Sequence, residues 1–304
     1  MVRAVSLLPS ATETICALGL ADQLVGRSHE CDYPASISHL PACTESRLPP
    51  GDSAAVDRSI RGILQQALSV YRVDPERLRQ LAPDLIVTQT QCEVCAVSPR
   101  AVEEALAGWL GARPKILAVQ PDDLSAACRD IRAIARSLDA EPAGERLVRS
   151  LQERMRAIQA IATNRSRRPK VALIEWIEPL MSAGNWMPEL VAMAGGENLF
   201  GTAGAHSPWL DWTAVVAADP DIILVHPCGW NMDQAQSEMH FLTTRPDWPE
   251  LQAVRNGQVY LADGNQYFNR PGPRLAETLE ILAEVLHPGA FDFGHQGNGW
   301  RRFS

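Results

Sequence analysis

The stretch ERLVRSLQERMRAIQAIAT, residues 145–163, contains neither glycine nor proline. Its apolar side chains recur at helical spacing, whereas its arginines lie mostly off that stripe; the apolar positions are Leu147, Leu151, Met155, Ile158 and Ala162. The pattern predicts one amphipathic helix that begins at Pro142 and runs for about 22 residues, or roughly 33 Å. The Arg-Arg-Pro break at 167–169 follows it.

Short apolar runs alternate with helix-like segments on both sides of this helix. The runs are residues 2–8, 24–28, 85–88 and 115–119 before it, and 171–176, 222–225 and 259–262 after it. Such alternation predicts parallel sheets covered by helices. We therefore expect an α/β protein with two Rossmann-like lobes joined by a single long α-helix. The expected parts are an N-terminal lobe (1–139), the connecting helix (140–168), a C-terminal lobe (169–286) that ends with a helix over 275–286, and a loose, Gly-rich tail (287–304).

The start of the first helix also carries a local signal. Ser10 and Glu13, in the sequence Ser-Ala-Thr-Glu, fit a capping box that would satisfy the free N–H groups of the first turn. We expect this helix to end near Gly19, a residue suited to a helix C-terminus.

Composition excludes several classes of protein. The chain of 304 residues is 46% hydrophobic and 21% charged, as is usual for a globular protein, and its formal net charge is −8. No basic stripe suggests nucleic-acid binding, and no apolar run approaches the ~18 residues of a membrane span. Seven cysteines and an N-terminus without a signal-peptide pattern predict a cytoplasmic protein, or a periplasmic one if a signal peptide has been removed.

Four cysteines each follow a predicted strand, namely Cys31, Cys92, Cys95 and Cys228. Ligands bind at the carboxyl ends of strands in open α/β sheets, so these thiols could converge. A C-x-x-C pair ahead of a helix start at Ser98-Pro99 can hold zinc or an iron–sulfur cluster, or act as a redox dithiol. Inert thiols are the alternative, and His226, which ends a strand, is either a metal ligand or a hydrogen-bonded structural residue.

Tryptophans are concentrated in the second half of the chain. Core packing is the default role for each, but Trp209 and Trp230 lie in loop sequences, Ser-Pro-Trp and Pro-Cys-Gly-Trp, and are better candidates for the face of a flat ligand. Catalysis finds little support, because the chain has no G-x-S-x-G, P-loop, G-x-G-x-x-G after a strand, or H-E-x-x-H motif. We expect a binding protein and not an enzyme.

Six short motifs occur in an order that resembles a known family: SLLPSATE at 6–13, DYP at 32–34, APDLIV at 82–87, AGGEN at 194–198, DPDII at 219–223 and RPGPR at 270–274. The chain resembles the helical-backbone (class III) periplasmic binding proteins, which serve as vitamin B12 and iron-chelate receptors of ABC importers, and especially the cobalamin-binding branch. The resemblance covers about residues 2–286.

This resemblance implies a rigid receptor that holds a large flat ligand in a cleft between its lobes and delivers it to an ABC permease. Positions that match the family's cleft are Glu30, Gln91, Glu175, Met181, Trp209, Gln266, Tyr267 and Arg270. Glu30, Gln91 and Glu175 stand where the family tends to have aromatic residues. The expected ligand is cobalamin, another corrinoid or a metal-containing compound, stacked on aromatic rings, paired with Arg270 and touched by the cysteines.

A second hypothesis keeps the fold and changes the function. In it the chain is a cytosolic metalloprotein or redox enzyme whose cysteines hold zinc or an iron–sulfur cluster permanently.

Overall fold

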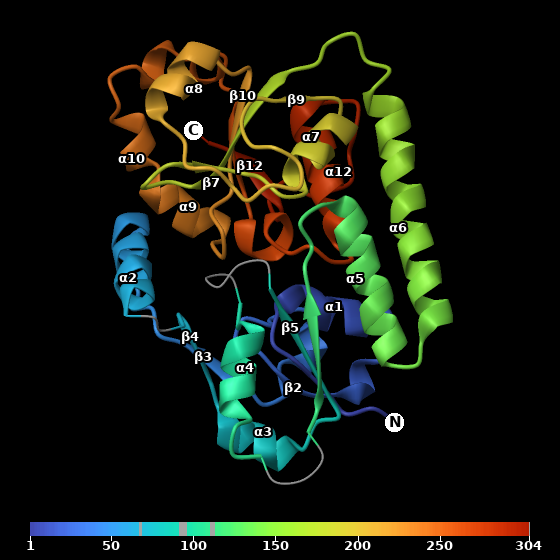
Figure 1. Cartoon of the computed structure of the whole chain (residues 1–304). Helices are drawn as coiled ribbons and strands as arrows, with labels where there is room; N and C mark the ends of the chain where they lie inside the picture. The colour runs from blue at the N-terminus through green and yellow to red at the C-terminus, as the bar shows by residue number, and fades with distance from the viewer. Residues whose placement is uncertain (67–68, 91–95, 110–112, 304) are drawn as a thin grey trace. The chain divides into compact units, whose positions relative to one another are not determined.

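The computed structural model describes residues 1–66, 69–90, 96–109 and 113–303, and Figure 1 shows its helices and strands. The chain divides into two compact units. The first comprises Met1–Gly51, Ala55–Pro121 and Ser125–Ser150, and the second comprises Asp52–Ala54, Asp122–Leu124 and Leu151–Ser304. The boundary falls inside helix α6, Glu141–Ala162, which is the long helix predicted from the sequence. Both units are α/β, as expected, and the ligand cleft expected between the lobes stays a prediction.

The first unit is built on a parallel sheet with strand order β2-β1-β5-β6, formed by Leu24–Arg27, Ala4–Ser6, Leu85–Gln89 and Lys115–Val119. Side chains on its strands alternate between two cores. Ala4 belongs to one cluster of buried residues and Val5 to another, so both faces are covered, as is usual for parallel sheets. A separate antiparallel pair joins β3, Thr44–Ser46, to β4, Tyr71–Val73. The helices are α1 (Pro9–Ala17), α2 (Ser53–Gln65), α3 (Pro75–Leu81), α4 (Pro99–Ala105) and α5 (Leu124–Ser137).

The second unit has a mixed sheet. Its strands follow the order β12-β11-β10-β7-β8, with β9 also paired to β7: Trp300–Arg302, Val259–Ala262, Ile222–Val225, Lys170–Trp176, Met181–Ser182 and Glu197–Asn198. Strands β7, β10 and β11 are parallel, whereas β8 and β12 run antiparallel to their neighbours. Its helices are α7 (Met187–Met193), α8 (Trp212–Ala218), α9 (Met232–Glu238), α10 (His240–Thr243), α11 (Gln252–Arg255) and α12 (Leu275–Leu286).

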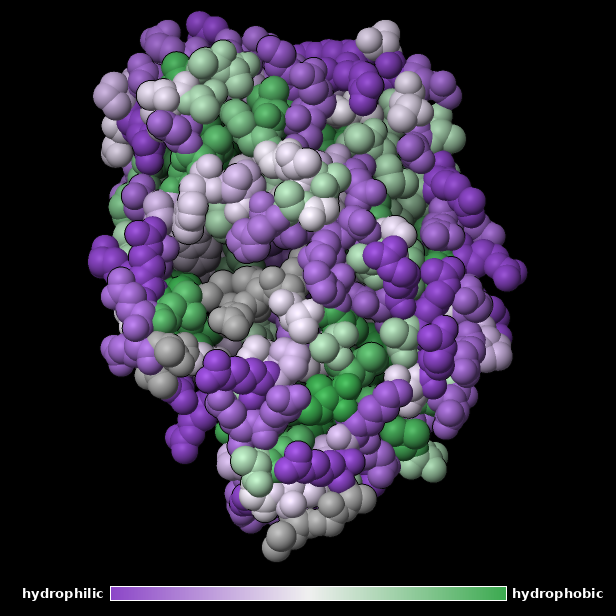
Figure 2. Space-filling view, in the orientation of Figure 1, coloured by the Kyte–Doolittle hydropathy of each residue, from purple (hydrophilic) through white to green (hydrophobic). Residues whose placement is uncertain are grey.

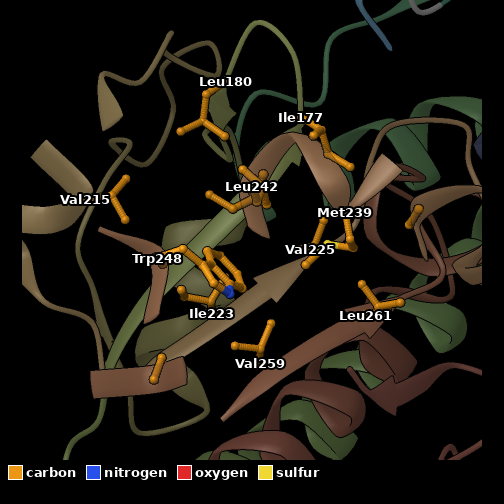
Figure 3. Packing of buried hydrophobic residues seen from close by; sticks show 14 of the residues in the cluster. Ile177, Leu180, Val215, Ile223, Val225, Met239, Leu242, Trp248, Val259 and Leu261 are labelled. Atoms are coloured by element: carbon orange, nitrogen blue, oxygen red, sulfur yellow. The ribbon is translucent and has the colours of Figure 1, made fainter. Parts of the chain in front are cut away.

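Figure 3 shows one core of this unit. Ile223 and Val225 from β10 and Val259 and Leu261 from β11 belong to one cluster with Trp248, and all five side chains are almost fully buried. The isoleucine and valine residues fit a pleated surface well, which explains why short apolar runs form these strands.

Helix α6 forms because its apolar stripe is buried along the whole length. Val148, Leu151, Met155, Ile158 and Ala162 are each at most 8% exposed, and Figure 2 shows hydrophilic residues along its outward side. A Cβ on Gly144 would lie 2.6 Å from the Cβ of Ala135, so this glycine permits close approach of α5 and α6 in the first unit. No helix in the described part of the chain is long and apolar enough to cross a membrane.

Two local expectations were wrong. Helix α1 begins at Pro9 with Leu8 as its N-cap, no side chain caps it, and Ser10 and Glu13 are buried inside it. The predicted capping box therefore does not form, because proline already suits the first helical position. The C-terminal segment is also not loose, since β12 pairs with β11 and Trp300 is buried.

Candidate functional site

The carboxyl ends of β7, β10 and β11 meet at one edge of the second unit's sheet, because the three strands are parallel. We call this the second-unit edge. Met181 also belongs to it, since β8 turns back antiparallel from the end of β7, and Trp209 forms a bridge with Met181. The structure therefore gathers eight predicted site residues here: Glu175, Met181, Trp209, Cys228, Trp230, Gln266, Tyr267 and Arg270.

Glu175, the second-last residue of β7, is a half-buried carboxylate held by a neighbouring loop. The Ser207 hydroxyl lies 3.0 and 2.9 Å from its two oxygens and donates to the carboxylate, while the N–H of Gly184 donates to the Ser207 oxygen at 3.1 Å. This chain of hydrogen bonds fixes the position of a negative charge at the second-unit edge. Ser207 gave no signal in the sequence.

Aromatic rings lie beside this carboxylate. The rings of Trp176 and Trp230 are 5.1 Å apart and tilted by 53°, which is a favourable aromatic pair. Trp209 is 60% exposed, an unusual exposure for so large an apolar side chain. The edge thus offers planar apolar surface. Trp176 was not predicted as a site residue, although it ends a strand as the others do.

The turn after β11 is packed tightly onto the end of β10. Residues Gly264–Phe268 form a π-helical turn that begins after Asp263, whose Oδ1 accepts the N–H of Gln266 at 2.7 Å. A Cβ on Gly264 would lie 2.1 Å from the carbonyl oxygen of Pro227, so only glycine fits. Burial raises the pKa of Asp263 above its ordinary value, although hydrogen bonds from backbone N–H groups and the charge of Arg270 act in the opposite direction.

Two arginines support the same turn. Arg270 is only 4% exposed, and its Nη2 donates to Oδ1 of Asn265 at 2.8 Å. Arg274 donates to Oε1 of Gln266 at 2.8 Å and lies over the Tyr267 ring, 5.3 Å from its centroid. The predicted pairing of Arg270 with an anionic ligand group stays a prediction. Asn265 and Arg274 had not been predicted as site residues.

His226 is fully buried at the end of β10. Its ring stacks on Phe268 at 4.6 Å, and neither ring nitrogen has a hydrogen-bond partner within the described ranges. Burial lowers its pKa to about 3, so the ring is neutral at physiological pH. This environment fits a structural role better than a role as an accessible metal ligand, but among the described residues the ring is held by packing and not by the expected hydrogen bonds.

The first unit has a more hydrophilic edge after β2. The Thr44 hydroxyl lies 3.0 Å from Oγ of Ser28 and 2.8 Å from Nδ1 of His29, and it accepts the N–H of His29 at 3.1 Å. The predicted site residue Glu30 accepts a hydrogen bond from the Tyr71 hydroxyl at 2.8 Å. Burial and the nearby Arg27 lower the pKa of His29, with Glu45 opposing them. We call these residues the first-unit edge.

The predicted cysteine site is only partly described. Gln91, Cys92 and Cys95 lie outside the described residues. Cys31 is buried in the first unit, where its sulfur accepts a hydrogen bond from Thr12 at 3.0 Å, and Cys228 is half-buried in the second. Over the described ranges, no three Cys, His, Asp or Glu side chains form a group that could hold a metal ion. Zinc or iron–sulfur binding by the four cysteines therefore stays a prediction.

Comparison with known proteins agrees with the fold. A profile of the family described as periplasmic binding protein matches residues 5–265. An uncharacterized ABC transporter substrate-binding lipoprotein, YvrC of Bacillus subtilis, is 25% identical over 94% of this chain and 80% of its own. The vitamin B12-binding protein of Vibrio parahaemolyticus is 25% identical over 93% of this chain and 87% of its own.

Solved structures share the fold at lower identity. The periplasmic heme-binding protein RhuT from Roseiflexus matches with a TM-score of 0.70 and 23% identity, over 95% of this chain and 98% of that one. The vitamin B12-binding protein BtuF of Vibrio cholerae matches with a TM-score of 0.65 and 20% identity, over 93% and 96%.

The same comparisons correct the expected location. The relatives are described as a lipoprotein or as periplasmic proteins, which indicates a periplasmic or extracellular location. The cytoplasmic prediction, which relied on cysteine number and on the first residues, was wrong.

Proposed function

The chain belongs to the periplasmic binding protein family, and from that premise we propose that its ligand is a corrinoid such as cobalamin. It is a solute-binding protein of the type that serves ABC importers of vitamin B12, heme and iron chelates. Such proteins bind a small molecule and deliver it to an ABC permease. The alternative of a cytosolic metalloprotein or redox enzyme has no support from these comparisons.

The observation that carries the proposal is the aromatic surface of the second-unit edge. A corrin ring is broad and nearly flat, so it gains most from rigid aromatic faces. Trp209 offers such a face because it is 60% exposed, and the half-buried Trp230, which packs on Trp176, offers a second. Relatives with the name vitamin B12-binding protein give this ligand its chemical class.

The charge at this edge favours a corrinoid over heme. The periphery of cobalamin carries mainly neutral amides, whereas heme carries two carboxylates. Glu175 can accept hydrogen bonds from amide N–H groups, but its fixed negative charge repels carboxylates. Arg270 and Arg274 already donate to amide oxygens of the turn after β11.

Titration with cyanocobalamin, followed by calorimetry and tryptophan fluorescence, tests the proposal. We expect binding with quenching of fluorescence, and weaker binding of hemin. Trp209→Ala should weaken cyanocobalamin binding by about tenfold or more, as expected for an aromatic anchor. Ile161→Ala is the matched control, because Ile161 is also a large exposed apolar residue, 54% exposed, but lies on α6.

A second variant tests the charge argument. Glu175→Gln keeps an acceptor and removes the charge, so it should strengthen hemin binding relative to cyanocobalamin binding. Failure of the wild-type protein to bind cyanocobalamin would overturn the proposed ligand. Equal affinities of the Trp209→Ala variant and the wild type would remove Trp209 from the site.

A further inference from the structure

The C-terminal segment 287–303 reaches the second-unit edge. Strand β12 pairs with β11 so that Trp300 lies opposite Ala262, and the N–H of Asp263 donates to the carbonyl of Gly299 at 2.9 Å. Asp263 is the N-cap of the turn that carries Gln266 and Tyr267. The segment is therefore bonded to the first residue of that turn.

Two buried carboxylates on α12 hold the segment in place. Glu284 accepts hydrogen bonds from the indole N–H of Trp300 and the backbone N–H of Phe293, both at 2.5 Å. Glu280 accepts two hydrogen bonds from Arg154, at 2.6 and 2.7 Å, and its Oε2 lies 2.8 Å from Nε2 of His295. Burial alone would raise the pKa of Glu280, but the hydrogen bonds from His295 and Arg154 bring it below its ordinary range.

His295 is thereby held beside Tyr267, which is a predicted ligand-binding residue. Its ring meets the Tyr267 ring edge to face, with centroids 5.9 Å apart and an interplanar angle of 68°. The Arg274 guanidinium also lies over the Tyr267 ring. The backbone carbonyl of Tyr267 accepts a hydrogen bond from the Thr278 hydroxyl at 2.8 Å. The orientation of the Tyr267 ring thus depends on a residue that lies 28 positions further along the chain.

We propose that His295 is a positioning residue for Tyr267, and that segment 287–303 is in this way part of the ligand-binding machinery. Glu280 orients the imidazole, the imidazole restricts the tyrosine ring, and the restricted ring presents a preorganised face to a planar ligand. The binding consequence rests on the proposed function, whereas the restriction of the ring does not.

The restriction can be measured without ligand. In protein labelled with 3-fluorotyrosine, the signal of Tyr267 is one of four and is identified by its loss in Tyr267→Phe. We expect one narrow fluorine signal in the wild type and a broadened or doubled one in His295→Ala. His295→Phe restores an aromatic ring beside Tyr267 and should restore a narrow signal. His240→Ala is the control, because it removes a histidine that packs on an aromatic ring, Phe241, at 4.3 Å elsewhere in the unit.

The binding arm uses cyanocobalamin as the probe. His295→Ala should weaken binding about three- to tenfold, His295→Phe should recover most of that loss, and His240→Ala should change nothing. An unchanged Tyr267 signal in His295→Ala would overturn the positioning role, whatever the ligand. Unaltered affinity in His295→Ala, with the signal broadened, would overturn the link to binding. A wild type that fails to bind cyanocobalamin contradicts the proposed ligand, and the fluorine signals still decide the positioning role.

Discussion

A histidine follows a strand at the edge of each unit, and the two histidines lie in opposite environments. His29 is half-buried, and its Nδ1 lies 2.8 Å from the Thr44 hydroxyl. His226 is fully buried against Phe268, and its ring nitrogens lack a partner within the described ranges. The histidine of the first-unit edge thus lies among hydroxyl groups that exchange hydrogen bonds, whereas the histidine of the second-unit edge is packed closely against an aromatic ring.

This difference indicates how each edge tolerates change. Ser28 and Thr44 of the first-unit edge are buried, so the loss of one hydroxyl leaves its partner unsatisfied and costs about 1–3 kcal/mol. The turn after β11 is packed tightly onto the end of β10 and cannot relax, so substitutions there cost more. The second-unit edge, which carries the aromatic surface, should therefore be the more sensitive of the two to substitution and to acid.

The largest effect is expected from Gly264→Ala. The added Cβ would lie 2.1 Å from the Pro227 carbonyl oxygen and 2.6 Å from that of His226, and backbone atoms cannot move aside cheaply. We expect a loss of more than about 3 kcal/mol in the free energy of unfolding, measured with urea. Gly62→Ala in α2 of the first unit is the control. No atom lies within 4 Å of its added Cβ, so it should stabilise by about 1 kcal/mol. Equal effects of the two substitutions would refute the packing argument.

The next effect is a pH dependence that His226 imposes. Its pKa is about 3 in the folded protein and near 6.5 in the unfolded chain, so the unfolded chain binds the extra proton between these values. The stability that the neutral His226 contributes is fully present above pH 6.5 and is lost as the pH falls below it. The loss in the free energy of unfolding is about 1.4 kcal/mol per pH unit, or about 2 kcal/mol by pH 5. His226→Phe keeps a ring against Phe268 and should remove this slope. A wild type and a variant with parallel pH profiles would show that His226 does not titrate this way.

A smaller effect is expected at the first-unit edge from Thr44→Val. The substitution removes the hydroxyl that is hydrogen-bonded to the Ser28 hydroxyl and to both the backbone N–H and the ring of His29. We expect a loss of about 1–2 kcal/mol in the free energy of unfolding. Thr163→Val is the control, because Thr163 is exposed and its hydroxyl donates to the carbonyl of Gln159, one turn back along the chain. Its cost should stay within about 0.5 kcal/mol. If Thr44→Val cost as much as Gly264→Ala, the two edges would not differ in tolerance.

The sequence predicted what depends on local pattern. The runs at 85–88, 222–225 and 259–262 form β5, β10 and β11, and the apolar stripe of α6 is buried. These features could be predicted because the spacing of apolar residues along a single helix or strand is visible in the local sequence. The capping box failed because two local signals competed and Pro9 prevailed. Contacts such as Ser207 with Glu175 and His295 with Tyr267 join loops whose approach depends on the assembled sheet, and no pattern in the sequence marks them.

The smallest effect should come from His29. Burial lowers its pKa, Arg27 adds to the lowering and Glu45 opposes it, so the sign is that of His226 and stability falls as the pH drops below 6.5. The loss should be smaller, because the ring is partly exposed and the Thr44 oxygen can accept a hydrogen bond from a charged imidazole. Urea unfolding of His29→Gln from pH 8 to pH 5 should therefore flatten the profile by less than His226→Phe does. Should His29→Gln flatten it as much, the two histidines would be equally desolvated, and hydroxyl groups at the first-unit edge would offer no protection against acid.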